Sequence, residues 1–303
     1  MPSAEFNAVI EALTARPPAI PVDVHGARQA IDELMGGAPL ADGVTVEAVT
    51  VAARAAEWIR PPAPTSDRVV LYLHGGGFRI GSLTAYRPFA SQLAVALETP
   101  LLVVDYRLAP EHPFPAGLED CLAGYAWLLA TGWRSDQIAI MGDSAGGGLV
   151  ASTLLAAKRR GLPQPAAGVC LSPLTDLTCT TKAYARNART DPYFSIKAAS
   201  EGARDYLGDI DPRRPLVSPI FGDLSDLAPV LIHASTHEVL ADDAVALAAR
   251  ISECRGRVQL DMWPEMTHVW HAMIPHVPES VAAIADVRLF LESSFMASAW
   301  SIT

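Results

Sequence analysis

The spacing of apolar residues divides the chain into two parts. Near the N-terminus, apolar positions recur at helical spacing over residues 7–14 and 24–35, with Pro17, Pro18 and Pro21 between them. We therefore expect two short helices separated by a proline-rich stretch. Further along, the pattern changes to short β-branched and aromatic runs of the kind that form strands.

Eight apolar runs in this second part have the length and composition of β-strands. They occupy residues 44–51, 55–59, 68–73, 101–106, 138–142, 168–172, 230–234 and 258–263. Stretches with helical periodicity separate most of the later runs, at residues 83–97, 116–130, 145–160, 241–254 and 279–294. Continuous apolar strands that alternate with helices are typical of a mostly parallel sheet covered on both faces. The sequence therefore predicts an α/β fold with an eight-stranded sheet, whose first two strands form an antiparallel edge.

One interval interrupts this alternation. Residues 173–229 lie between two predicted strands, are rich in Pro, Asp and Arg, and contain a helical stretch at 196–207. An insertion at this point in an α/β sheet lies above the carboxyl ends of the strands, where ligands bind. We expect a helical cap, formed by an insertion at about 176–215 and an N-terminal cap segment at 1–43, over a main domain at 44–303.

Composition and charge limit the possible partners. The chain has 303 residues, 50% hydrophobic and 18% charged, so it can bury a large core without a metal or a disulfide. The formal net charge of −10 disfavours nucleic acids and anionic membranes as partners. The four cysteines form no CxxC pair, and no apolar run is long enough for stable membrane insertion. The N-terminus lacks the pattern of a signal peptide, so we expect a cytoplasmic protein. We also expect that the protein needs no cofactor.

The first candidate for chemistry is a serine between glycines. The sequence Gly142-Asp143-Ser144-Ala145-Gly146 follows a predicted strand and opens a predicted helix. In this context a G-x-S-x-G forms a sharp turn that lifts the serine hydroxyl clear of the backbone, and its glycines avoid collisions with the neighbouring strand and helix. Ser144 is therefore a candidate nucleophile, although a helix start that merely packs closely has a similar composition.

A second glycine-rich segment, His74-Gly75-Gly76-Gly77-Phe78, follows another predicted strand. Its backbone N–H groups can point at a reacting oxygen, and acyl transfer requires at least two such donors at the oxyanion. The chain contains neither a P-loop nor a G-x-G-x-x-G motif, which argues against a phosphate loop. We interpret this segment as part of an oxyanion hole and expect His74 to have a structural, not a catalytic, role.

A nucleophilic serine needs a base and an acid, which in this chain order come after the serine, acid first and histidine last. His268 lies five residues beyond the last predicted strand and is the preferred base, with His271 as the alternative. The acid follows the preceding strand, where Glu238, Asp242 and Asp243 are the candidates. Glu238 lies in the loop itself, whereas the two aspartates begin a helix, where acids also favour the helix dipole.

Together these motifs resemble the bacterial hormone-sensitive-lipase family of α/β-hydrolase carboxylesterases. The resembling stretches are HGGGF (74–78), DYRLAPEHPFPAGLED (105–120), GDSAGG (142–147), LVSPIFGDLSDLAP (216–229), EVLADD (238–243) and MTHVW (266–270). The resemblance implies an α/β-hydrolase fold with a helical cap and a serine hydrolase that acts on esters with short to medium acyl groups. It extends from about residue 44 to the C-terminus.

The resemblance also implies roles for individual residues. Ser144 is the expected nucleophile and His268 the base, and the family's Asp-Pro-Leu acid corresponds to Glu238-Val239-Leu240, a departure that leaves Asp242 open. Backbone N–H groups of the glycines at 75–77 and of Ala145 are the expected oxyanion donors.

Substrate choice falls to the cap and the residues beneath it. We expect Phe78, Asp143, Tyr193 and Trp270 to line the substrate pocket. The partner is a small-molecule ester, and the family implies a possible homodimer through the strand at 258–263. Two alternatives remain, namely an amide or arylformamide hydrolase with the same site and a non-catalytic small-molecule binder on this fold.

Overall fold

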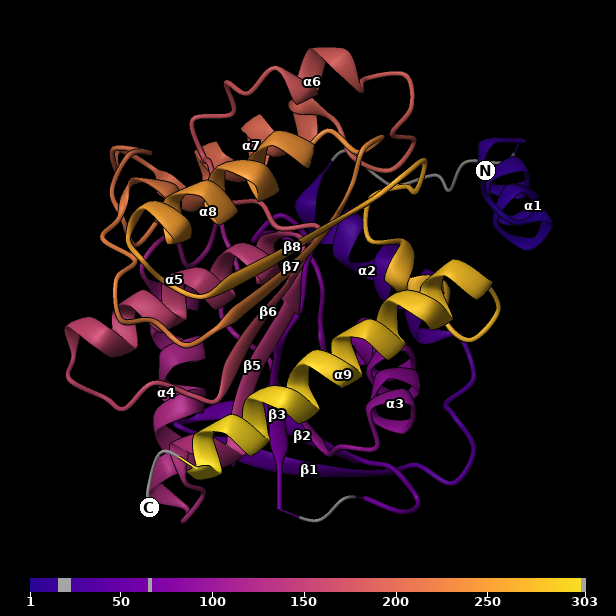
Figure 1. The fold of residues 1–303 in the computed structure, drawn as a ribbon. Helices are drawn as coiled ribbons and strands as arrows, with labels where there is room; N and C mark the ends of the chain where they lie inside the picture. The colour runs from indigo at the N-terminus through magenta and orange to yellow at the C-terminus, as the bar shows by residue number, and fades with distance from the viewer. Residues whose placement is uncertain (16–22, 65–66, 301–303) are drawn as a thin grey trace.

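The computed structural model describes all residues except 16–22, 65–66 and 301–303. The prolines predicted to separate the first two helices therefore lie outside the described residues. Within the described part of the chain, the strands form one eight-stranded sheet with the order β1-β2-β4-β3-β5-β6-β7-β8 (Figure 1). The predicted α/β fold with a mostly parallel sheet is confirmed, and only the pairs β1–β2 and β2–β4 are antiparallel among these strands.

The strands follow the predicted apolar runs closely. They are β1 (Thr45–Val51), β2 (Arg54–Arg60), β3 (Val69–Leu73), β4 (Leu101–Val104), β5 (Ile138–Asp143), β6 (Ala167–Leu171), β7 (Val230–Ser235) and β8 (Val258–Trp263). Every residue of β3, β4, β5, β6 and β7 is buried, because helices cover these strands on both faces. The first strand and the last are only partly covered, since each lies at an edge of the sheet.

The helices form a layer on each face of the sheet (Figure 1). One layer contains α3 (Leu83–Leu97) and α9 (Pro278–Trp300), and the other contains α4 (Ala116–Ala130), α5 (Ala145–Arg159) and α8 (Ala241–Glu253). Two separate apolar clusters fill the space between these layers and the sheet. The core is therefore a three-layer sandwich that holds the strand ends rigidly, which is what a site at those ends requires.

The predicted cap insertion contains two described helices, α6 (Ala183–Arg186) and α7 (Ile196–Leu207). Both lie at the top of Figure 1, at the carboxyl end of the parallel strands. Of the N-terminal helices, α1 (Ala4–Ala15) contacts α9 and α2 (Val24–Gly36) packs on α3. The division into a cap and a main domain stays a prediction.

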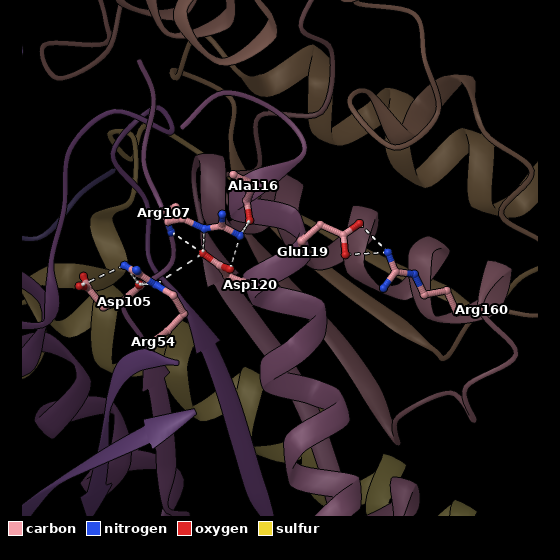
Figure 2. Close-up of polar contacts among 7 residues, drawn as sticks. All are labelled: Arg54, Asp105, Arg107, Ala116, Glu119, Asp120 and Arg160. Atoms are coloured by element: carbon pink, nitrogen blue, oxygen red, sulfur yellow. Dashed lines mark hydrogen bonds and ion pairs between the residues drawn. The ribbon is translucent and has the colours of Figure 1, made fainter. Parts of the chain in front are cut away.

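An ion pair anchors the segment that follows β4. The Arg107 side chain binds both carboxylate oxygens of Asp120 on α4, at 2.7 and 2.8 Å, and Arg54 lies against the same carboxylate (Figure 2). The neighbouring Glu119 pairs with Arg160 at the end of α5. Tyr106 lies beside this anchor, and its hydroxyl donates to the carbonyl of His74 at 2.7 Å. The segment after β4 thus supports the glycine segment after β3.

Candidate active site

Ser144 lies in the turn between β5 and α5, with a backbone φ of +53° and ψ of −120°. This left-handed backbone is strained for a residue with a side chain and is what lifts a serine hydroxyl out of a strand-to-helix turn. A Cβ on Gly146 would overlap the carbonyl oxygen of Leu73 on β3, and one on Gly142 would lie 2.5 Å from the same oxygen. The two glycines are therefore required by close packing, as the motif predicts.

The serine is hydrogen-bonded to the predicted base. His268 Nε2 lies 2.9 Å from Ser144 Oγ, and His268 Nδ1 lies 2.8 Å from Glu238 Oε2. Because an ionised carboxylate can only accept, Nδ1 carries the proton and Nε2 is left to accept from the serine hydroxyl. The other carboxylate oxygen of Glu238 accepts from the backbone N–H of Ser235 at 2.7 Å, so both oxygens of the carboxylate have a hydrogen-bond partner. The structure thus brings Ser144, His268 and Glu238 into one hydrogen-bonded chain.

Electrostatics favour a protonatable base at this position. Burial lowers the pKa of His268, but the hydrogen bond and charge of Glu238, together with the charges of Asp191 and Asp143, outweigh it, and the net pKa is raised above that of an ordinary histidine. The side chain of Glu238 is fully buried and that of His268 is 8% exposed. The pair can therefore take up the serine proton in a site largely shielded from water.

The alternative acids have other partners. Asp242 Oδ2 accepts from the backbone N–H of Ala183, and its Oδ1 pairs with Arg186 at 2.7 Å, both on α6. Asp243 is fully buried and accepts from the N–H groups of Thr175 and Asp176 at 2.9 Å. Neither carboxylate is hydrogen-bonded to His268, whereas that of Glu238 is.

The alternative base is also placed elsewhere. His271 is fully buried, and its Nε2 lies 3.3 Å from Nδ1 of His233 on β7. Burial, together with the nearby His233 and His268, lowers the pKa of His271 far below its ordinary value. His271 therefore belongs to the packing behind the site, not to its surface.

The glycine segment is fixed by Asp143, the residue before the serine. Its Oδ1 accepts from Tyr72 Oη at 2.7 Å and from the N–H of Gly75 at 3.0 Å, and its Oδ2 accepts from Tyr86 Oη at 3.0 Å. Asp143 is only 2% exposed, so it holds the glycine segment from within instead of facing the pocket that the sequence predicts. Burial raises the pKa of Asp143, and its hydrogen bonds partly offset this.

This arrangement sorts the predicted oxyanion donors. The N–H of Gly75 is committed to Asp143. Among the described residues, the N–H groups of Gly76, Gly77 and Ala145 have no hydrogen-bond acceptor. Ala145 begins α5, whose first N–H groups lack partners in the helix, and no side chain caps them. These three groups are available to an oxyanion beside Ser144.

The residues predicted to line the pocket occupy different environments. Trp270 is fully buried in a small core with Phe6 of α1, so it supports the segment after His268 and presents no surface to a pocket. Phe78 is 3% exposed and stacks on Tyr206 of α7 with ring centroids 4.0 Å apart. Of the residues predicted to line the pocket, Tyr193 alone is substantially exposed, at 41%.

Sequence reasoning missed the residues of the cap that contact the triad. The ring of Phe194 stacks on the imidazole of His268, with centroids 5.0 Å apart and planes at 22°. Asn187 and Asp191 make hydrogen bonds to the loop that carries Glu238. No sequence pattern marks them, because a polar residue in a loop normally faces solvent.

A comparison with protein families agrees with the fold. A family model described as the alpha/beta hydrolase fold matches residues 70–272. The fold and the site therefore define an enzyme of the α/β-hydrolase class.

Three similar proteins narrow this class. The chain is 40% identical to an acetyl-hydrolase of Streptomyces hygroscopicus over 258 residues, which cover 85% of this chain and 84% of the relative. A crystal structure of an esterase from the bacterial hormone-sensitive lipase family is similar with a TM-score of 0.93 and 41% identity, over 97% of this chain and 99% of that one. A crystal structure of EstE5 soaked with p-nitrophenyl butyrate is similar with a TM-score of 0.92 and 38% identity, over the same shares. The chain belongs to the bacterial hormone-sensitive-lipase family of α/β-hydrolase carboxylesterases.

Two further observations concern membranes and metals. Across the residues that the structure describes, every helix is too short or too polar to pass through a bilayer. The same residues contain no cluster of three or more His, Cys, Asp or Glu side chains placed to hold a metal ion.

Proposed function

We propose that this carboxylesterase hydrolyses small esters with short to medium acyl groups through an acyl-enzyme on Ser144. The observation that carries the proposal is the hydrogen-bonded chain from Ser144 to His268 to Glu238. A nucleophile, a base and an orienting acid in this order are the arrangement required for serine acyl transfer.

Acylation begins when His268 Nε2 takes the hydroxyl proton and Ser144 Oγ attacks the ester carbonyl. The imidazolium that forms is stabilised by Glu238 through the hydrogen bond at Nδ1. The carbonyl oxygen becomes an oxyanion, and the N–H groups of Gly76, Gly77 and Ala145 can donate hydrogen bonds to it. When the carbon–oxygen bond breaks, His268 gives its proton to the leaving alcohol.

Deacylation repeats these steps with water. His268 removes a proton from a water molecule that attacks the acyl-enzyme, and then returns a proton to Ser144 Oγ as the carboxylic acid leaves. Loss of a single oxyanion donor typically costs about 10²–10³ in rate, so the glycine segment is expected to contribute substantially to catalysis.

The size of the acyl group is inferred from the cap and from the relatives. Phe194 lies on His268 and Tyr206 packs on Phe78, so aromatic side chains of the cap limit the space near the serine. One similar protein is named an acetyl-hydrolase, and another was soaked with p-nitrophenyl butyrate. Both point to short acyl groups.

A panel of p-nitrophenyl esters with acyl chains from two to twelve carbons tests this proposal, with the matching p-nitroanilides beside it. We expect turnover to be highest for the short esters and absent in Ser144→Ala. Activity that persists in that variant would refute the nucleophile. Anilide turnover equal to that of the esters would favour an amide hydrolase, and binding of both without turnover would favour a non-catalytic binder.

We also propose that two copies pair through β8. This strand is an edge of the sheet and its residues are only partly covered, so its backbone can extend the sheet into a second copy. Sedimentation equilibrium of the wild type and of Leu260→Pro tests this, because the backbone N–H of Leu260 points away from β7 in the observed register. A monomeric wild type would overturn it.

A further inference from the structure

The cap is hydrogen-bonded to the loop that carries the triad acid. We name residues 236–239 the acid loop and residues 187–194 the cap strap. Asn187 Nδ2 donates to the carbonyl oxygens of Thr236 and Glu238, at 2.9 and 2.7 Å. Thr190 Oγ1 donates to the carbonyl of His237 at 2.8 Å. Three successive carbonyl groups of the acid loop are therefore held by two side chains of the strap.

Asp191 makes a further hydrogen bond to the acid loop and connects this loop to the segment that covers the base. Its Oδ2 accepts from the N–H of Val239, the residue after the acid, at 2.9 Å. Its Oδ1 accepts from the N–H groups of Tyr193 and Phe194, both at 3.1 Å. The ring of Phe194 in turn stacks on His268. One carboxylate thus fixes the backbone beside the acid and the aromatic ring that covers the base.

The burial of this carboxylate makes its loss consequential. Asp191 is only 6% exposed, so removing an acceptor oxygen leaves a backbone donor without a partner in a dry site. Asp191 also acts on the base through its charge: Glu238, Asp191 and Asp143 are the anionic groups that raise the pKa of His268, against its burial. The other titratable ring nearby is His271, whose own pKa is far below its ordinary value.

We propose that Asp191 is a positioning residue for Glu238 and His268, because its buried carboxylate joins the acid loop to the cap segment that covers the base. This inference rests on the proposed function of Ser144, His268 and Glu238. Asp191 acts through the backbone of Val239 and Phe194, not by contact with the reacting atoms. Catalytic groups must be held within a fraction of an ångström of their productive positions, so a loosened acid loop lowers the rate of chemistry more than it weakens substrate binding.

Asp191→Asn tests this, because the amide nearly matches the carboxylate in size but replaces one acceptor oxygen with a donor. We expect kcat for p-nitrophenyl acetate to fall about 10- to 100-fold, with KM changed by less than about threefold. The base must be neutral to act, and a lost negative charge lowers its pKa. We therefore also expect the acid limb of the kcat/KM profile to move to lower pH. A kcat/KM that is lower at every pH, with the acid limb of the profile unmoved, would indicate a structural role only and would overturn the inference.

Asp242→Asn is the matched control. Asp242 also joins the cap to the main body, through Ala183 and Arg186, but it has no hydrogen bond to the acid loop. We expect its kcat and acid limb to match those of the wild type. An equal loss in both variants would overturn the inference. If the wild type itself fails to turn over the ester, the proposed function fails instead, and the two failures are thereby distinguished.

Thr190→Val keeps the test decisive if Asp191→Asn does not fold. Thr190 is exposed and valine has nearly the same shape, so the fold tolerates the change while the hydrogen bond to His237 is lost. We expect kcat to fall about two- to fivefold. We also expect the acid limb of the kcat/KM profile to move to lower pH, as in Asp191→Asn. A kcat and a profile equal to those of the wild type would show that the strap does not position the acid loop.

Discussion

The nucleophile turn and the acid loop serve the same histidine, but the chain holds them in different ways. Ser144 is fixed by backbone contacts with neighbouring strands: its N–H donates to the carbonyl of Leu171 on β6, and Gly142 and Gly146 allow its turn to pack closely on Leu73 of β3. Glu238 lies in a loop that depends on side chains of the cap about 50 residues earlier, above all Asn187 and Asp191. The turn at Ser144 is therefore held by backbone packing within the sheet, and the loop at Glu238 largely by side chains of residues 187–194.

The largest effect is expected from Glu238→Gln, which removes the charge at the acid while keeping its shape. Because glutamine no longer selects the proton at Nδ1 or stabilises the imidazolium, kcat should fall about 10³- to 10⁴-fold. The acid limb of the pH profile should also move to lower pH, since Glu238 contributes most among the groups that raise the pKa of His268. Steady-state kinetics across pH 5–9, with Asp242→Asn as control, measures both; a greater loss in Asp242→Asn would make Asp242 the acid.

Gly146→Ala should have the next largest effect, and it acts on the nucleophile turn. The added methyl group would overlap the carbonyl oxygen of Leu73 and lie 2.5 Å from that of His74, so α5 has to move away from β3. We expect kcat to fall about 10²-fold or more, since a displacement near 1 Å at the nucleophile has that cost. Gly132→Ala is a control with nothing within 4 Å of the new Cβ, although its positive φ adds some strain. Activity in Gly146→Ala equal to the control would contradict the packing argument.

Asp143→Asn is expected to have a smaller effect, because it loosens the glycine segment without altering Ser144. The amide cannot accept from Tyr72, Gly75 and Tyr86 at once, so one of these donors loses its partner. If Gly75 shifts, Gly76 and Gly77 move with it, and we expect kcat to fall about 10-fold. Stopped-flow measurement of the acylation burst locates the loss, and an unchanged burst rate would show that Asp143 does not position the oxyanion donors.

The smallest effect concerns the ring over the base. Phe194→Leu keeps an apolar cover on His268 but removes the aromatic stack. We expect a two- to threefold change in kcat/KM, about the effect of losing one ring contact, with a larger change for bulkier acyl groups. The acyl-length profile of the variant measures this. Identical profiles for the variant and the wild type would show that Phe194 does not limit the substrate.

The contrast between the two regions also explains what could be predicted from the sequence. Alternating strands and helices, and the serine between two glycines, are local patterns, so the sheet and the nucleophile turn follow from neighbouring residues. The expected order of acid and histidine points to the loops after β7 and β8, and the structure brings Glu238 and His268 of these loops into contact. The role of Asp143 was misjudged, because nothing in the motif shows whether its side chain faces a pocket or turns inward to Tyr72 and Tyr86. Trp270 was likewise expected in the pocket and lies in the core.

The links from the cap strap lie beyond any local pattern. Asn187 and Asp191 have ordinary loop character, and their partners are known only once the chain is folded. The aspartate-to-glutamate departure at position 238 was visible from the sequence, but the hydrogen bonds that hold this loop in place were not.

The hydrogen bonds between the strap and the acid loop have a consequence for engineering this enzyme. A cap transplanted from a relative that lacks these side chains would not hold this loop, and the recipient would lose part of its triad geometry together with its old specificity. Residues 187–194 and 236–239 therefore form one exchangeable module, and chimeras that carry both should retain turnover where those that carry the cap alone do not.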